Sequence, residues 1–273
     1  MDRYSHDGLA FDVTDTGPPD GRVVIALHGF PEDRRCWDGI SADLAAGGFR
    51  VLAPDQRGYS PRARPAGRRS YTLDRLGADV LALADAAGAD RFDLLGHDWG
   101  AAVAWDLAAR RPDRVRSLTA LSTPHPAAFR EALLRGQLLR SWYMLLFQLP
   151  ALPELLIVAG GASALEKDGL DASSARRYAE RFSQRGALTG PLNWYRAMPF
   201  GLRDPTPDVG VPVLYVWGTR DRYLGRAAAE ATAGHVRGPY RFEVLGGASH
   251  WLPETRADRV APLVLEHLGA APA

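Results

Sequence analysis

Short apolar runs alternate with amphipathic stretches along most of this chain. The runs predict strands near 9–13 and at 23–27, 49–53, 92–95, 115–121, 211–217 and 240–245. Helices are predicted between them at 33–46, 73–87, 101–110, 226–233 and 255–268, with Pro262 bending or restarting the last one. Continuous apolar runs are typical of strands buried on both faces. The alternation therefore indicates an α/β fold with a mostly parallel central sheet flanked by helices.

The alternation is interrupted between residues 124 and 205, where no strand pattern occurs. Three helices are predicted within this segment: one over 133–146, one that begins at Ser173 or Ser174, and one over 192–198. The strand–helix pattern resumes afterwards. We therefore predict an all-helical cap over 124–205, inserted into a core that consists of residues 1–123 and 206–273.

Composition and charge limit the number of domains, the partners and the compartment that we expect for this protein. The chain has 273 residues, 46% of them apolar, which fits one large domain or a core with an inserted subdomain. Its 33 basic and 32 acidic residues give a net charge of +1, so we expect no nucleic-acid partner. The single cysteine, Cys36, cannot form an internal disulfide, and neither a signal-peptide core nor an apolar run of membrane length is found. We expect a cytoplasmic protein, monomeric or homodimeric, with no membrane partner.

The segment 94–100, with the sequence LLGHDWG, joins a predicted strand to a predicted helix. A strand, a tight turn flanked by glycines and a helix form a nucleophile elbow, which raises one side chain on a strained turn. The raised residue here is Asp98. A carboxylate is ionised near neutral pH without a base, and it suits displacement at an sp3 carbon that carries a leaving group. The product is an ester on Asp98, which an activated water must then hydrolyse.

Two further polar residues follow the ends of predicted strands, where ligands bind in open parallel sheets. They are Asp221 and His250, and the chain order nucleophile, acid, histidine matches that of the α/β-hydrolase fold. His250 is predicted to be the general base that activates water, and Asp221 to orient its ring. No acidic residue follows the strand that ends at Leu121, so the common alternative position for the acid is empty.

Cleavage of an ester passes through an oxyanion, which backbone N–H groups can bind. We expect these donors to be Trp99, directly after the nucleophile, and Phe30, because Pro31 has no N–H. His28 and His97 are expected to orient the surrounding loops. The seven histidines show no metal-ligand spacing, so neither a metal nor a cofactor is expected.

Four segments together resemble the soluble epoxide hydrolases of the α/β-hydrolase superfamily: 28–32 (HGFPE), 96–100 (GHDWG), the loop of Asp221, and 247–250 (GASH). The resemblance covers nearly the whole chain, and it implies the α/β-hydrolase fold with an inserted helical cap. In that family two cap tyrosines bind and protonate the epoxide oxygen. The segments PLNWYR and YMLLFQ carry this role to Tyr195 and Tyr143. The implied enzyme converts an epoxide into a vicinal diol.

Apolar residues of the predicted cap, such as Leu146, Phe147 and Leu149, indicate a small hydrophobic epoxide as the substrate, with water as the second reactant. The residues expected to contact this substrate are aromatic: Phe30, Trp99, Phe147, Trp194 and Trp251.

Two alternatives stay open. A haloalkane dehalogenase shares the fold and the aspartate nucleophile, and Trp142 and Trp194 would serve as its halide donors, although some dehalogenases have asparagine where Phe30 stands. Fluoroacetate dehalogenases carry arginine after the nucleophile, where this chain has Trp99. The second alternative is a catalytically idle hydrolase fold that only binds a ligand. Such a protein has no chemical need for nucleophile, acid and base together.

Overall fold

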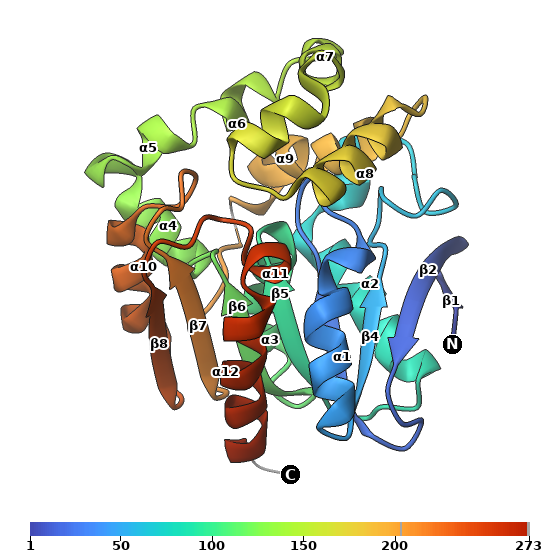
Figure 1. The fold of residues 1–273 in the computed structure, drawn as a ribbon, viewed down its shortest axis with the longest axis vertical. Helices are drawn as coiled ribbons and strands as arrows, with labels where there is room; N and C mark the ends of the chain where they lie inside the picture. Colours follow the sequence, from blue (N-terminus) through green and yellow to red (C-terminus); the bar gives the residue numbers. More distant parts are fainter. Residues whose placement is uncertain (203, 272–273) are drawn as a thin grey trace.

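The computed structural model describes residues 1–202 and 204–271, and it centres on an eight-stranded sheet (Figure 1). The strands are β1 (Arg3–His6), β2 (Leu9–Thr16), β3 (Arg22–Leu27), β4 (Phe49–Pro54), β5 (Phe92–His97), β6 (Val115–Leu121), β7 (Val213–Gly218) and β8 (Tyr240–Leu245). Their order across the sheet is β1-β2-β4-β3-β5-β6-β7-β8. The β1–β2 and β2–β4 pairs are antiparallel and the other pairs are parallel. The predicted α/β fold with a mostly parallel sheet is confirmed.

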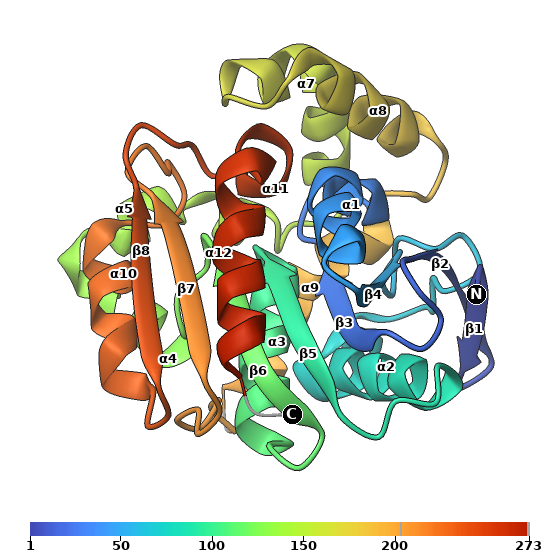
Figure 2. The same ribbon diagram turned by 60° about the horizontal axis from the view of Figure 1, so that its bottom comes forward.

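Helices cover both faces of the sheet (Figure 2). One face carries α2 (Leu73–Ala86) and α3 (Trp99–Arg110), and the other carries α1 (Asp38–Ala46) and α12 (Ala257–Ala270). Successive residues of β3 alternate between the two cores, with Val23, Ile25 and Leu27 in one and Val24 and Ala26 in the other. This alternation follows from the two-residue period of a strand. Because both faces are buried, the carboxyl ends of the strands are held in fixed relative positions.

The described residues between β6 and β7 form helices and no strand. The helices are α4 (Pro126–Ala132), α5 (Gln137–Arg140), α6 (Tyr143–Leu146), α7 (Leu152–Lys167), α8 (Ala172–Ser183) and α9 (Thr189–Gly201). We call residues 124–205 the helical insertion. Most of it, from α5 to α9, lies above the carboxyl edge of the sheet (Figure 1). After β7, the chain forms α10 (Arg226–Ala231), β8, α11 (Leu252–Thr255) and α12.

Helix α8 ties the helical insertion to the core. The Arg181 guanidinium lies 3.2 Å from the carboxylates of Asp33 and Asp55, which follow β3 and β4. One turn earlier, the hydroxyl of Tyr178 donates to the carboxyl of Glu254 in α11, at 2.7 Å. Burial and the neighbouring carboxylate of Glu32 raise the pKa of Glu254 well above its usual value. Polar contacts to three core segments therefore fix α8 over the end of the sheet.

The helical insertion differs in detail from the prediction. The predicted helix over 133–146 is broken into short turns, because Gly136 takes a left-handed conformation with φ of 97°. Helix α7 was not predicted, since its apolar residues surround the helix and Gly161 interrupts it with φ of 54° and ψ of −155°. Helix α8 is capped by Asp171, not by Ser173 or Ser174, because the Asp171 carboxylate accepts from both serine N–H groups. In the core, α12 runs through Pro262 as one helix.

Candidate active site

The turn between β5 and α3 consists of Asp98 alone, since β5 ends at His97 and α3 begins at Trp99. Its φ of 49° and ψ of −121° lie in a sparsely populated backbone region. The turn packs closely against β3. A Cβ atom at Gly100 would lie 2.0 Å from the carbonyl oxygen of Leu27, so only glycine fits there. The side chain of Asp98 makes no capping bond to α3, and its carboxylate faces the space above the sheet.

The two carboxylate oxygens of Asp98 have different partners. Oδ1 accepts a hydrogen bond from the backbone N–H of Phe30 at 2.8 Å, and Oδ2 lies 3.5 Å from Nε2 of His250. Burial raises the pKa of Asp98, but the imidazoles of His250 and His97 and the N–H of Phe30 together lower it below its usual value. Asp98 is therefore an ionised carboxylate with one oxygen held and the other free to react.

His250 and Asp221 form the second contact of the site. Nδ1 of His250 lies 2.8 Å from Oδ2 of Asp221, and both side chains are buried. Oδ1 of Asp221 accepts from the backbone N–H groups of Tyr223 at 2.8 Å and Leu224 at 2.9 Å. Burial lowers the pKa of His250, but the carboxylates of Asp221 and Asp98 raise it well above its usual value. The His250 ring therefore lies between two carboxylates that both favour its protonated form.

A buried contact between His97 and Glu32 lies behind His250. Nε2 of His97 is 2.9 Å from the carbonyl oxygen of His250, which also accepts from the Ser122 hydroxyl at 2.8 Å. Nδ1 of His97 lies 2.7 Å from Glu32, whose other oxygen accepts from the N–H of Gly29 at 2.7 Å. Burial raises the pKa of Glu32, but His97 and the Gly29 N–H outweigh this effect, so the pKa lies below its usual value. Both nitrogens of His97 thus face acceptors, and the pair joins three loops of the site.

His28 supports the neighbouring loop, in keeping with the role expected for it. Its Nε2 accepts from the N–H of Gln56 at 3.2 Å, and its Nδ1 lies 2.9 Å from the carbonyl oxygen of Gly29. Gly29 itself has no room for a side chain, because a Cβ atom there would lie 2.3 Å from the Cβ of Asp98. The loop after β3 is therefore held directly against Asp98.

A cavity of about 800 Å³ separates Asp98 from the helical insertion. Tyr143 and Tyr195 line it from α6 and α9, with ring centroids 6.2 Å apart. Burial, and then the negative charge of Asp98, raise the pKa of both phenols well above the usual value. Both tyrosines therefore stay protonated near neutral pH and can donate hydrogen bonds into the cavity.

The aromatic residues expected to contact substrate divide into two groups. Phe30, Phe147 and Trp251 line the cavity. Trp99 and Trp194 are not among the lining residues: the Trp99 ring packs edge-on against Tyr195 at 5.0 Å, and the Trp194 N–H donates to the carbonyl oxygen of Arg57 at 2.8 Å. The first tryptophan packs against one of the two cavity phenols and the second anchors α9 to the core, and their contact with substrate stays a prediction. Trp99 still opens α3, so its backbone N–H is a free donor at the helix N-terminus.

Two cavity residues were missed in the sequence. The Tyr223 ring meets that of His250 edge-on at 5.0 Å, and its hydroxyl donates to Asp168 at 2.5 Å. Its position two residues after Asp221 was the available signal. Phe182 of α8 stacks on Phe30 at 5.7 Å, and no local sequence signal distinguishes it from an ordinary core residue.

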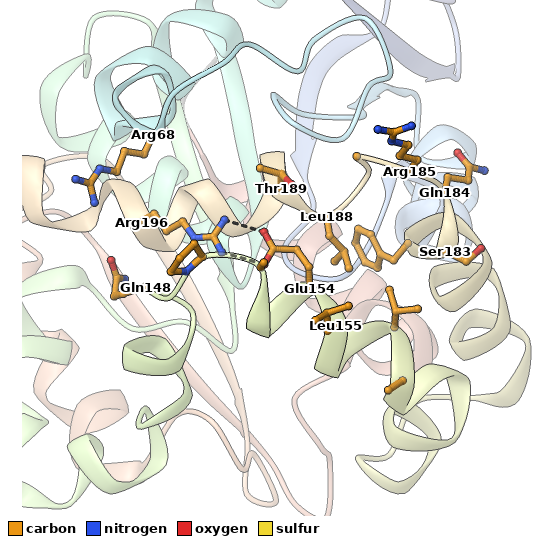
Figure 3. A pocket seen from close by; sticks show the side chains of 16 residues that line it. Arg68, Gln148, Glu154, Leu155, Ser183, Gln184, Arg185, Leu188, Thr189 and Arg196 are labelled. Carbon is orange, nitrogen blue, oxygen red and sulfur yellow. Dashed lines mark hydrogen bonds and ion pairs between the residues drawn. The ribbon is translucent and has the colours of Figure 1, made fainter.

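A second cavity, of about 1160 Å³, is lined by residues of α7, α8 and α9 (Figure 3). Phe182 and Val158 line both cavities. The side chains of Arg196 and Glu154 form an ion pair at 2.9 and 3.0 Å along this second cavity. Arg196 also donates to two carbonyl oxygens in the turn after α6. The pair therefore joins α9 to α7 along the cavity that Phe182 also lines.

The chain matches known proteins over almost all of its length. A family model described as the α/β hydrolase fold matches residues 22–257. The chain is 37% identical to AB hydrolase superfamily protein YfhM of Bacillus subtilis, over 96% of this chain and 95% of that protein. It is 33% identical to epoxide hydrolase A of Mycobacterium tuberculosis, over 96% of this chain and 95% of that protein. Epoxide hydrolase 3 of Xenopus tropicalis is 34% identical, over 97% of this chain and 76% of its own.

Solved structures of epoxide hydrolases are also similar to this chain over almost its whole length. The structure of epoxide hydrolase A from Mycobacterium thermoresistibile superimposes with a TM-score of 0.87 at 27% identity, covering 99% of this chain and 98% of that one. An epoxide hydrolase from metagenomes of hot environments also superimposes with a TM-score of 0.87, at 29% identity, and covers 98% of both chains.

Proposed function

Because the chain belongs to the epoxide hydrolases of the α/β-hydrolase fold family, we propose that it hydrolyses an epoxide to a vicinal diol through an ester on Asp98. One observation carries the proposal: an aspartate in the nucleophile elbow faces two neutral phenols across an apolar cavity. A carboxylate suits attack on an sp3 carbon, and a phenol suits a developing alkoxide. The helical insertion is the cap, and it supplies both phenols.

In the first step, Oδ2 of Asp98 attacks a ring carbon while the carbon–oxygen bond of the epoxide breaks. Oδ2 is the attacking atom because the N–H of Phe30 holds Oδ1. Tyr195 or Tyr143 gives its proton to the ring oxygen, which becomes a hydroxyl. Phe30, Phe147 and Trp251 line the pocket and suit a hydrophobic substrate.

Ester formation removes the negative charge of Asp98, and the pKa of His250 therefore falls. The proton that His250 releases balances the one that the phenol donated. The neutral Nε2 then takes a proton from water, and the hydroxide attacks the ester carbonyl of Asp98. The N–H groups of Phe30 and Trp99 bind the oxyanion that forms at Oδ1. As the ester bond breaks, His250 gives its proton to the departing alkoxide oxygen, which completes the diol. The water oxygen that remains on Asp98 then passes its own proton to His250, and this restores the Asp98 carboxylate.

The dehalogenase alternative is less well supported by this site. The N–H of Trp194, one of its two candidate halide donors, is used by the carbonyl oxygen of Arg57. The other candidate, Trp142, is 61% exposed at the mouth of the cavity. The two cavity phenols, in contrast, suit the protonation of an epoxide oxygen.

The decisive experiment is a single turnover of a simple aryl epoxide by excess enzyme in 18O-water, followed by mass spectrometry of the Asp98 peptide. We expect a diol and one heavy oxygen on Asp98. A diol without label on Asp98 would mean that water attacks the epoxide directly, and the ester mechanism would be wrong.

A trapping experiment covers the case in which no diol forms. His250→Gln removes the base, so an ester on Asp98 should accumulate. An adduct that forms from a haloalkane alone would identify a dehalogenase. No adduct from either an epoxide or a haloalkane would favour a protein that only binds its ligand.

A further inference from the structure

Exposed apolar side chains are concentrated on one part of the helical insertion. Among the described residues, ten of the fourteen large apolar side chains that are exposed lie between Leu134 and Val158. We call these ten residues the apolar patch: Leu134, Leu138, Leu139, Trp142, Leu145, Leu149, Leu152, Leu155, Leu156 and Val158. Leu134 and Leu139 are 94% and 81% exposed. Large apolar side chains exposed together on one part of a protein are typical of an interaction site.

The apolar patch surrounds the mouth of the active-site cavity. It occupies α5, α6 and the first half of α7, which form the outer side of the helical insertion (Figure 1). Four of its residues also line the cavity above Asp98: Leu139, Trp142, Leu156 and Val158. Whatever covers the apolar patch therefore also faces the route by which a substrate enters.

The charge of the apolar patch is positive. The sequence from Leu133 to Pro153 contains two arginines, Arg135 and Arg140, and no aspartate or glutamate. Among the described residues neither arginine forms a salt bridge with a carboxylate, and Arg140 donates to two backbone carbonyl oxygens beyond β7. Glu154, at the border of the patch, is already paired with Arg196. An apolar surface with unneutralised arginines complements a surface that is apolar inside and negatively charged outside.

We infer that the apolar patch docks on the surface of an anionic lipid bilayer, with the mouth of the active-site cavity facing the lipid. Leucine and tryptophan side chains enter the region between headgroups and acyl chains, and arginines bind the anionic headgroups. A second copy of the chain fits less well, because a protein seated on the patch would close the mouth. A bilayer leaves it open to apolar molecules dissolved in the lipid.

This docking is peripheral. Within residues 1–202 and 204–271, no helix has the length and apolar character that crossing a bilayer requires. The lack of such a segment led to the prediction of no membrane partner, but docking on a membrane surface does not need a spanning segment. The inference goes beyond the proposed reaction, and its test requires no turnover.

The test is sedimentation of the protein with vesicles of phosphatidylcholine alone and of phosphatidylcholine mixed with phosphatidylglycerol. We expect binding to the mixed vesicles that weakens with added salt and with Arg135→Gln. The triple variant Leu134→Ser/Leu145→Ser/Leu155→Ser should bind about 100-fold more weakly, because each leucine loses its burial in the lipid. Leu202→Ser/Val244→Ser is the control, since these residues are exposed but lie outside the patch, and it should bind like the wild type.

Three results would overturn the inference. Equal sedimentation of the triple variant and the wild type, or no sedimentation with any vesicle, would show that the apolar patch does not bind lipid. A dimer of the wild type in analytical ultracentrifugation, with a monomeric triple variant, would assign the patch to an interface between copies. Turnover of a water-soluble epoxide, measured in parallel, reports on the proposed reaction separately, because the three substituted leucines do not line the active-site cavity.

Discussion

Replacing Asp221 by asparagine should separate the two chemical steps. Oδ1 of Asp221 accepts from two backbone N–H groups, those of Tyr223 and Leu224, and Oδ2 faces Nδ1 of His250 at 2.8 Å. In Asp221→Asn, the amide oxygen must keep the backbone contacts, so the NH2 group faces Nδ1. The proton of the neutral ring then moves to Nε2, which can no longer take a proton from water.

The magnitude follows from the same contacts. Turning the amide around would leave two buried N–H donors without acceptors, at a cost of about 1–3 kcal/mol each, so the unproductive orientation dominates. Removing the corresponding carboxylate of a serine-protease triad slows turnover about 10,000-fold, a barrier increase of about 5.5 kcal/mol. We expect a similar loss in ester hydrolysis. Attack by Asp98 should fall by much less, because its Oδ1 contact with Phe30 does not involve Asp221.

Rapid quenching followed by mass spectrometry of the intact protein measures both steps. Asp221→Asn should accumulate nearly stoichiometric ester within one turnover, whereas the wild type should not. Asp171→Asn is a matched control, because asparagine also caps helices well and Asp171 lies at the start of α8, away from the triad. Hydrolysis in Asp221→Asn within tenfold of the wild-type rate would refute the proposed role of Asp221.

Three further predictions test other parts of the site. Tyr195→Phe should slow ester formation about 100-fold without slowing ester hydrolysis, and adding Tyr143→Phe should slow ester formation further, as rapid quenching would show. Unchanged ester formation in the double variant would exclude a role for the phenols. The hydrolysis rate of pre-formed ester should rise with pH and level off, because hydrolysis needs neutral His250. The midpoint of this rise should lie below the pKa that NMR gives for His250 in the resting enzyme, where the charge of free Asp98 raises that pKa. A midpoint at or above the NMR value would contradict the scheme. Gly100→Ala should lower the free energy of unfolding by about 3 kcal/mol or more in urea titrations, because the added Cβ meets a main-chain oxygen of β3. Gly269→Ala is the control and should be neutral or stabilising, because its Cβ meets open space. Equal stabilities of the two variants would remove the steric argument.

The sheet and the central residues of the site were accessible from the sequence for one physical reason. Buried parallel strands form continuous apolar runs, and the carboxyl ends of such strands meet at one edge. Residues placed after those runs must therefore approach each other, and the structure places the His250 ring 3.5 Å from the carboxylate of Asp98 and 2.8 Å from that of Asp221. The roles of these residues remain predictions for the experiments above.

The helical insertion was less accessible, because its shape depends on contacts that no periodicity records. Apart from Glu154, the first half of α7 is apolar on all sides, so it has no single buried face to detect. The position of Trp194 illustrates the same limit: an aromatic residue beside Tyr195 suits substrate contact, yet its N–H is used by the carbonyl oxygen of Arg57 in the core. The pairing of Glu32 with His97 also joins residues far apart in the chain.

The phenols and the triad lie on different stretches of the polypeptide, with Tyr143 and Tyr195 in the helical insertion and Asp98, Asp221 and His250 in the core. Under the proposed reaction, protonation of the ring oxygen and much of the contact with the substrate depend on the insertion, whereas attack by Asp98 and release of the product depend on the core. Mutation can therefore explore new substrates in one stretch while inheriting a working release step from the other. This separation makes the protein a favourable starting point for evolving new specificities, since each change needs to satisfy only one half of the chemistry.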